Sequence, residues 1–175
     1  MTETYQTLAA RTVSPDFHTD LVTPRDLIGT LFEISRVADL SNELKRSLFY
    51  GVPYTSGDEV AVAGEIGLTG VSPGPGVDIN PDYYHALLGF ASEAGEIADA
   101  ILTTLLNHTP LDTENLKEEA GDMRWYGALL ATALEARESD IEEANIAKLR
   151  TRFPDKFTAA AAVTRDLDAE KVALS

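Results

Sequence analysis

The chain has 175 residues and no cysteine, and its 14 Lys and Arg against 29 Asp and Glu give a formal net charge of −15. The lack of cysteine excludes a disulfide framework and any Cys-ligated zinc or iron–sulfur site, and it fits a reducing, cytoplasmic location. The negative charge argues against nucleic-acid or membrane partners. No apolar run approaches the roughly 18 residues of a membrane span. We also expect no secretory signal.

The first part of the chain contains one predicted long helix between two less regular segments. Residues 1–22 are polar and aperiodic, and we expect them to form an N-terminal arm. Thr23 and Pro24 favour a helix N-terminus, and apolar residues then recur at helical spacing until glycine and proline end the run. Residues 51–80 are rich in Gly and Pro, which predicts a loop insert with room for a short hairpin at 59–71.

Four further helices are predicted after the insert. They run from Asn80 to about Asn107, from Thr113 to Ala136, from Ser139 to near Phe153, and from Thr158 towards the C-terminus. Ser139 begins a capping box, in which the serine caps backbone N–H groups and a glutamate three residues later reaches back. We therefore expect an all-α bundle, with a single helical domain over residues 23–175 that carries the insert.

Two acidic pairs occur at three-residue spacing on consecutive predicted helices. Glu93 and Glu96 flank the apolar stripe of one helix, Glu119 falls inside the stripe of the next, and Asp122 borders it. Burying an unpaired charge costs several kcal/mol, so these positions predict a compensating cation. With oxygen ligands only, Mg²⁺ is preferred and Mn²⁺ is a substitute. The plain alternative is that the pairs face water, and a di-iron site would need Glu-x-x-His pairs that the sequence lacks.

A basic segment follows on the next predicted helix. Asn145, Lys148 and Arg152 share one face of it. Taken alone, basic residues at a helix C-terminus usually complement the helix dipole. Beside an acidic metal cleft they are better suited to hold phosphate oxygens, which Arg and Lys bind by charge-assisted hydrogen bonds.

Three segments carry a family resemblance: SEAGEIADAI, NLKEEAGDMRWYGALL and EEANIAKLRTRFPDKF. Together they resemble the MazG-like family of all-α nucleoside triphosphate pyrophosphohydrolases, whose pattern of Glu-x-x-Glu followed by Glu-x-x-Asp is complete here. The Asn-x-x-Lys with a following Arg also matches. The resemblance covers about residues 80–172 and extends to short phage and bacterial members, among them a (d)GTP-specific MazZ-like subgroup. Residues 1–75 depart from the family pattern.

The resemblance implies hydrolysis of a (d)NTP to (d)NMP and pyrophosphate, with (d)GTP as the first candidate and dUTP or another dNTP as the alternative. It implies that the four carboxylates hold Mg²⁺ and that Glu93 or Glu96 orients or deprotonates a water. Lys148 and Arg152 would hold the phosphates, and Asn145 would bind the phosphates or the sugar. Four aromatic residues would stack on the base or belong to the core: Trp125, Tyr126, Tyr84 and Phe90.

The resemblance also implies a homo-oligomer, either a dimer or a tetramer, in the cytoplasm (of the host cell if a phage encodes the chain). The strongly amphipathic helices favour such an assembly independently, because more than one apolar face needs a partner.

A different class of protein also fits the composition, namely a non-enzymatic acidic DNA mimic or inhibitor. Such a protein would spread its acids over exposed faces. Two observations argue against this alternative: Glu119 lies within an apolar stripe, and the helix predicted from Ser139 to near Phe153 carries a basic segment.

Overall fold

The computed structural model describes residues 3–16, 18, 20–55 and 80–174, and all regular structure within them is helical. This confirms the predicted all-α fold class. The described residues divide into two compact units, one formed by residues 23–134 and the other by residues 1–22 together with 135–175. The domain boundaries expected from the sequence stay predictions.

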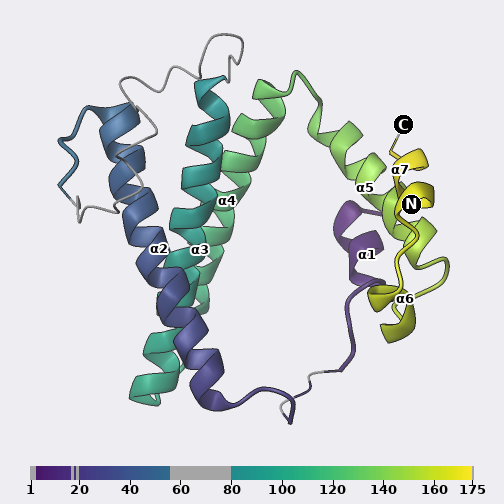
Figure 1. The fold of residues 1–175 in the computed structure, drawn as a ribbon, viewed down its shortest axis with the longest axis horizontal. Helices are drawn as coiled ribbons and strands as arrows, with labels where there is room; N and C mark the ends of the chain where they lie inside the picture. Colours follow the sequence, from purple (N-terminus) through teal and green to yellow (C-terminus); the bar gives the residue numbers. More distant parts are fainter. Residues whose placement is uncertain (1–2, 17, 19, 56–79, 175) are drawn as a thin grey trace, which may run out of the picture. The chain divides into compact units, whose positions relative to one another are not determined.

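Three long helices form the described part of the first unit: α2 (Pro24–Tyr50), α3 (Pro81–Asn107) and α4 (Thr113–Ala133). They lie side by side, and α3 packs against both α2 and α4 (Figure 1). The turn between α3 and α4 is short, as is usual for antiparallel neighbours. One turn of α3 can therefore face one turn of α4, which is the arrangement that two converging carboxylate pairs require.

The ends of these helices follow capping chemistry. The side chains of Thr23 and Asn80 each accept a hydrogen bond from a backbone N–H in the first turn of α2 and α3. Helix α2 ends at Gly51, whose φ of 68° is the left-handed conformation that glycine adopts without steric cost. The prediction that α4 reaches Ala136 is wrong, because the chain leaves the helix through Glu135 at a φ of 55°.

Two glycines allow α3 to approach its neighbours closely. A Cβ on Gly95 would overlap the Cβ of Ala38 on α2, and a Cβ on Gly89 would overlap the ring of Tyr126 on α4. All four residues are buried. Glu93 lies between the two glycines in the sequence, so the turn of α3 that carries it is fixed from both sides.

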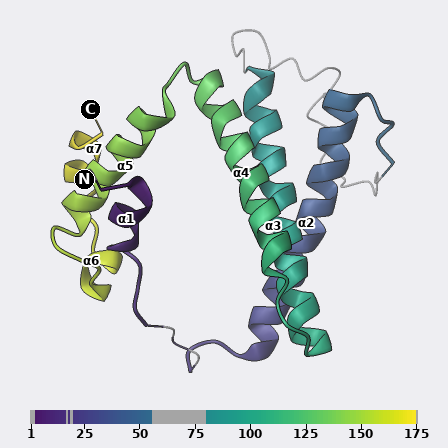
Figure 2. The same cartoon turned by 180° about the vertical axis from the view of Figure 1, so that it is seen from behind.

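The second unit contains four helices: α1 (Tyr5–Ala10), α5 (Glu138–Arg152), α6 (Ala159–Val163) and α7 (Leu167–Val172). Helix α5 packs against α1 and α7 (Figure 2). The sequence did not predict α1, because a helix of six residues is too short to show a clear apolar period.

Two predictions about this unit are wrong. Ser139 does not cap α5, because Arg137 occupies the N-cap position and binds both carboxylate oxygens of Asp140 across the first turn. The single helix predicted after Thr158 is broken in two. An extended residue, Thr164, ends α6, and the side chain of Asp166 then caps α7.

Within the described part of the chain, no helix combines the length and the apolar character that crossing a membrane requires. Most of the Gly- and Pro-rich insert expected at residues 51–80, including the hairpin considered at 59–71, lies outside the described residues.

We predict that Gly95→Ala lowers the stability of the protein by about 1–3 kcal/mol, because an added methyl group would overpack the contact with Ala38. Gly29→Ala is the matched control, since an added Cβ on this glycine of α2 meets no atom within 4 Å. There the better helix propensity of alanine should raise stability by about 0.5–1 kcal/mol. Urea unfolding measures both changes, and equal effects of the two substitutions would contradict the packing argument.

Candidate metal and nucleotide site

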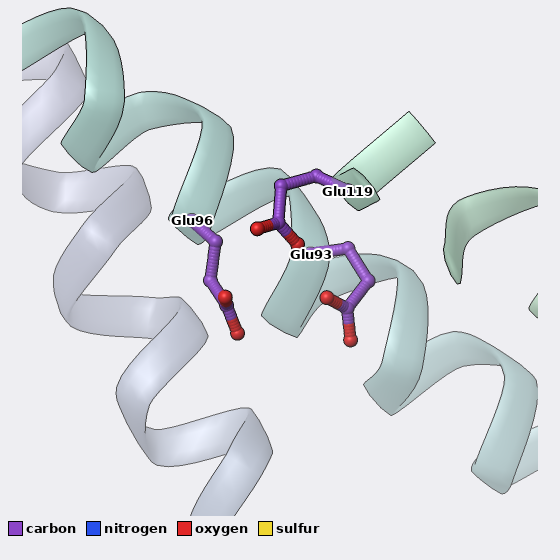
Figure 3. A group of neighbouring side chains, drawn as sticks. All are labelled: Glu93, Glu96 and Glu119. Carbon is purple, nitrogen blue, oxygen red and sulfur yellow. The ribbon is translucent and has the colours of Figure 1, made fainter. Parts of the chain in front are cut away.

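Three carboxylates of the first unit converge at one place. Glu93 and Glu96 lie one turn apart on α3, and Glu119 reaches them from α4 (Figure 3). One oxygen atom from each of the three lies within 4.8 Å of the others. Glu93 and Glu119 are only 6% and 3% exposed, whereas Glu96 is exposed to solvent. The structure therefore brings together three of the four carboxylates that the sequence singled out.

The electrostatics of this cluster favour a cation. Burial, followed by the negative charge of Glu96, raises the pKa of Glu119 to about 7. The pKa of Glu96 is also raised, first because neighbouring atoms partly shield its carboxylate from water and then by the negative charge of Glu93. The Asn115 side-chain amide opposes the shift of Glu119 by donating a 2.6 Å hydrogen bond to its Oε1 atom. Carboxylate oxygens without nitrogen or sulfur ligands fit Mg²⁺ or Mn²⁺, so the donor set agrees with the cation predicted from the sequence.

Asp122, the fourth predicted carboxylate, is not part of this group of three. It is exposed on α4 and borders the same pocket as Glu93. The structure thus places Asp122 at the rim, one turn beyond Glu119.

The cluster also contains a cation that sequence reasoning missed. Lys45 of α2 is 5% exposed, and its Nζ atom lies 3.6 Å from Oε1 of Glu93. The ammonium donates hydrogen bonds to Ser92 Oγ at 3.2 Å and to the Tyr126 hydroxyl at 3.0 Å. Lys45 lies two turns after Ala38, which the structure shows to be buried, and this position places Lys45 on the inward face of α2, but the sequence alone does not show which face is inward.

An aromatic pocket of about 320 Å³ adjoins the carboxylates. It is lined by Tyr50, Glu93, Asp122, Trp125 and Tyr126. Trp125 is 55% exposed, whereas Tyr126 is buried and packs edge-on against Trp125, with ring centroids 4.9 Å apart. Of the two aromatic residues of α4 predicted to bind substrate, Trp125 is thus free to stack on a ligand and Tyr126 belongs to the core.

The other two aromatic candidates differ in their surroundings. The ring of Phe90 packs near that of Tyr126, at 6.3 Å between centroids, and Tyr84 is half-buried. His85 stacks on Phe49 at 4.2 Å. Burial lowers the pKa of this histidine, with a further contribution from the positive charge of Lys45. His85 thus packs among aromatic rings and is not part of the carboxylate group.

The predicted phosphate-binding residues lie on α5, in the other unit. Arg152 binds Glu170 through two hydrogen bonds of 2.7 and 2.6 Å, and Arg165 also binds this glutamate. The side-chain oxygen of Asn145 accepts a hydrogen bond from the Tyr5 hydroxyl. Among the described residues Lys148 forms no salt bridge. These three side chains belong to the unit of residues 1–22 and 135–175, whereas the carboxylates belong to the unit of residues 23–134.

Comparison with known proteins gives two matches. A model of the MazG nucleotide pyrophosphohydrolase domain matches residues 84–157, a stretch that contains α4, α5 and most of α3. The Gene 37 protein of Mycobacterium phage L5 is 33% identical over 89 residues, which cover 48% of this chain and 78% of that protein. No solved structure matches the chain.

The raised pKa of Glu119 predicts how the stability of the metal-free protein depends on pH. Its ordinary pKa of 4.5 applies to the unfolded chain and the value of about 7 to the folded protein, so the folded state binds this proton more tightly. The resulting stabilisation is complete below about pH 4.5 and is lost as pH rises through 7. We therefore expect Glu119→Gln to raise the melting temperature at pH 8 in EDTA by several degrees, with little change at pH 5.

Glu118→Gln is the control, because it removes the neighbouring, exposed carboxylate of the same helix. Thermal melts in EDTA at several pH values between 5 and 8.5 measure the difference. Parallel profiles for the wild type and Glu119→Gln would contradict the assignment of the raised pKa to Glu119.

Proposed function

The chain belongs to the MazG family of nucleotide pyrophosphohydrolases, and from this premise we propose that it hydrolyses a (d)NTP to (d)NMP and pyrophosphate. Membership of this family makes the protein a hydrolase. The observation that carries the proposal is the convergence of Glu93, Glu96 and Glu119 from two helices within the matched stretch. Phosphate groups repel isolated carboxylates, so such a cluster suits a triphosphate only when cations lie between them.

The proposed cofactor is Mg²⁺, with Mn²⁺ as a substitute. Glu93, Glu96 and Glu119 would hold it, and Asp122 at the rim of the pocket would add a fourth carboxylate. When bound, such a cation neutralises charge on the phosphate oxygens and activates a water for attack. The raised pKa of Glu119 supports this proposal, since a cation would remove the cost of keeping that buried carboxylate ionised.

The different surroundings of the two glutamates of α3 suggest different roles. Glu93 is buried, accepts a hydrogen bond from Ser92 at 3.3 Å and pairs with Lys45, so its carboxylate is fixed in place. Glu96 is exposed and borders a second pocket of about 400 Å³. We therefore assign the orientation or deprotonation of the attacking water to Glu96, which solvent can reach.

Helix α5 is proposed to bind the phosphates through Asn145, Lys148 and Arg152. In support, the family model matches α5 in one stretch with α3 and α4. The bond to Glu170 uses the Nε and Nη2 atoms of Arg152. A guanidinium has five N–H donors, so Arg152 keeps donors for phosphate oxygens while Glu170 fixes its plane.

Trp125 is proposed to stack on the base of the nucleotide. Its exposed indole borders the pocket that contains Glu93, and Tyr126 supports it from the core. An aromatic platform accepts any base, because every base has a π face. Of the substrates within the family, (d)GTP is the first candidate and dUTP or another dNTP the alternative.

Membership of a hydrolase family argues against the alternative that the chain is a non-enzymatic acidic protein. A DNA mimic would display its acids, whereas Glu93 and Glu119 are buried among helices. A di-iron centre is also disfavoured, because the clustered donors in the described part of the chain are carboxylates alone.

The protein is further proposed to act as a homo-oligomer, either a dimer or a tetramer. Helix α2 exposes large apolar side chains at helical spacing among the described residues, and an exposed apolar row of this kind favours association. The row consists of Ile34, Val37, Leu40, Leu44 and Leu48.

We predict that pyrophosphate is released from at least one of the eight common NTPs and dNTPs in the presence of Mg²⁺, and that EDTA abolishes the release. Mutation of outer-shell partners of a metal ligand already costs about 10- to 100-fold. We therefore expect Glu119→Gln to lower kcat/KM at least about 100-fold. A colorimetric pyrophosphate assay with all eight nucleotides measures activity and base preference together.

Glu118→Gln again serves as the matched control and should keep full activity. The absence of pyrophosphate with every nucleotide, or an unimpaired Glu119→Gln enzyme, would disprove the proposed function.

We predict that light scattering gives two or four times the mass of one chain. Val37→Asp should reduce this mass, because it places a charge within the exposed apolar row of α2. Asp39→Lys changes a charge on another face of the same helix and should leave the mass unchanged. A monomeric wild-type protein would refute the proposed assembly.

A further inference from the structure

The environment of Lys45 is unusual for a lysine, since its ammonium is buried among three polar groups from two neighbouring helices. Lys45, Ser92, Glu93 and Tyr126 are 5%, 3%, 6% and 7% exposed. Lysine is almost never fully buried unless its charge is paired. The surroundings of Lys45 therefore have to supply both hydrogen-bond acceptors and a negative charge.

The structure supplies both. An ammonium has three N–H donors, and two of them are used by Ser92 Oγ and by the Tyr126 hydroxyl. The carboxylate of Glu93 lies 3.6 Å from Nζ and provides the charge. Ser92 also donates to Glu93 at 3.3 Å, so the ammonium is joined to this carboxylate both directly and through a hydroxyl. Lys45 is thus held in place from α3 and from α4.

This arrangement places a fixed positive charge next to a proposed cation ligand. Any divalent cation bound to Glu93 would lie close to the ammonium of Lys45, because both contact the same carboxylate. Like charges at such distances repel strongly in a site shielded from water. Lys45 must therefore oppose the binding of a divalent cation, even though it also holds the carboxylate of Glu93 in position.

We propose that Lys45 is a built-in cation of the carboxylate cluster, a positioning residue that acts through Glu93 and weakens the affinity of the cluster for free divalent cations. This inference rests on the proposed function, in which the same carboxylates hold Mg²⁺. As a consequence, the single positive charge of Lys45 neutralises the carboxylate cluster only in part before substrate binds. A divalent cation would then bind more readily together with the triphosphate, because the negative charge of the triphosphate would offset the repulsion by Lys45.

Lys45 lies outside the stretch of the chain that matches the family model. The matched stretch covers residues 84–157, whereas Lys45 belongs to α2, before the insert. Helix α2 therefore contributes to the site in addition to packing against α3.

The proposal is tested by measuring Mn²⁺ binding without nucleotide, using electron paramagnetic resonance to count free Mn²⁺. Two neutral variants are compared with the wild type: Lys45→Met, which keeps the length of the side chain, and Lys45→Gln, which also keeps a donor for Ser92 and Tyr126. We expect the dissociation constant for Mn²⁺ to fall at least ten-fold in both, because the repelling charge is gone.

The conservative variant Lys45→Arg retains the charge and should restore the weaker, wild-type affinity. Lys117→Met is the matched control, since Lys117 is an exposed residue of α4 paired with Glu114, and its removal should change the affinity less than two-fold. In EDTA the neutral variants should melt at lower temperature than the wild type, because Glu93 loses its partner, and Mn²⁺ should raise their melting temperature by more.

An unchanged or weaker Mn²⁺ affinity in both neutral variants would overturn the proposal, as would the absence of Mn²⁺ binding in every variant. The proposed function is judged separately, by pyrophosphate release from the wild-type enzyme. An active enzyme whose Mn²⁺ affinity does not depend on the charge at residue 45 would refute the role of Lys45 alone.

Discussion

The structure of the first unit depends on one electrostatic constraint, the burial of Glu93 and Glu119 beside a third carboxylate, Glu96. Burial, followed by the negative charge of Glu96, raises the pKa of Glu119 to about 7, so keeping this carboxylate ionised opposes folding. An arrangement that is unfavourable for the free protein is retained when a ligand uses it. The cost of the cluster is thus the strongest physical argument that a cation belongs there.

The packing of the helices explains how such a cluster is held together. Gly89 and Gly95 let α3 approach α4 and α2 closely, and Glu93 lies between these two contacts. The same close approach brings Lys45 within 3.6 Å of Glu93. Because the two glycines lack side chains, the helices pack closely enough to fix the positions of Lys45 and Glu93. The site therefore forms as the helices pack.

Much of this site could be predicted from sequence because helical periodicity reports which residues share a face. Spacing placed Glu119 inside the apolar stripe of its helix, and that glutamate is buried. Lys45 could not be recognised in this way. A lysine between Leu44 and Arg46 reads as a surface residue, and only the packing of α2 on α3 shows that it points inward. The prediction that Ser139 caps its helix failed for a similar reason. The Arg137–Asp140 pair, and not the local capping pattern, determines where the helix begins.

The three clustered glutamates differ in what holds them, and this difference supports the different roles proposed for them. Glu93 has Lys45 and Ser92 as partners, so its carboxylate is fixed whether or not a cation is present. Glu119 has only the Asn115 amide to oppose burial and the charge of Glu96, so it gains most from a cation. Glu96 is exposed and can still meet solvent. A buried carboxylate paired with a lysine, a buried carboxylate that gains from a cation and an accessible carboxylate together suit the proposed water-dependent cleavage of a triphosphate.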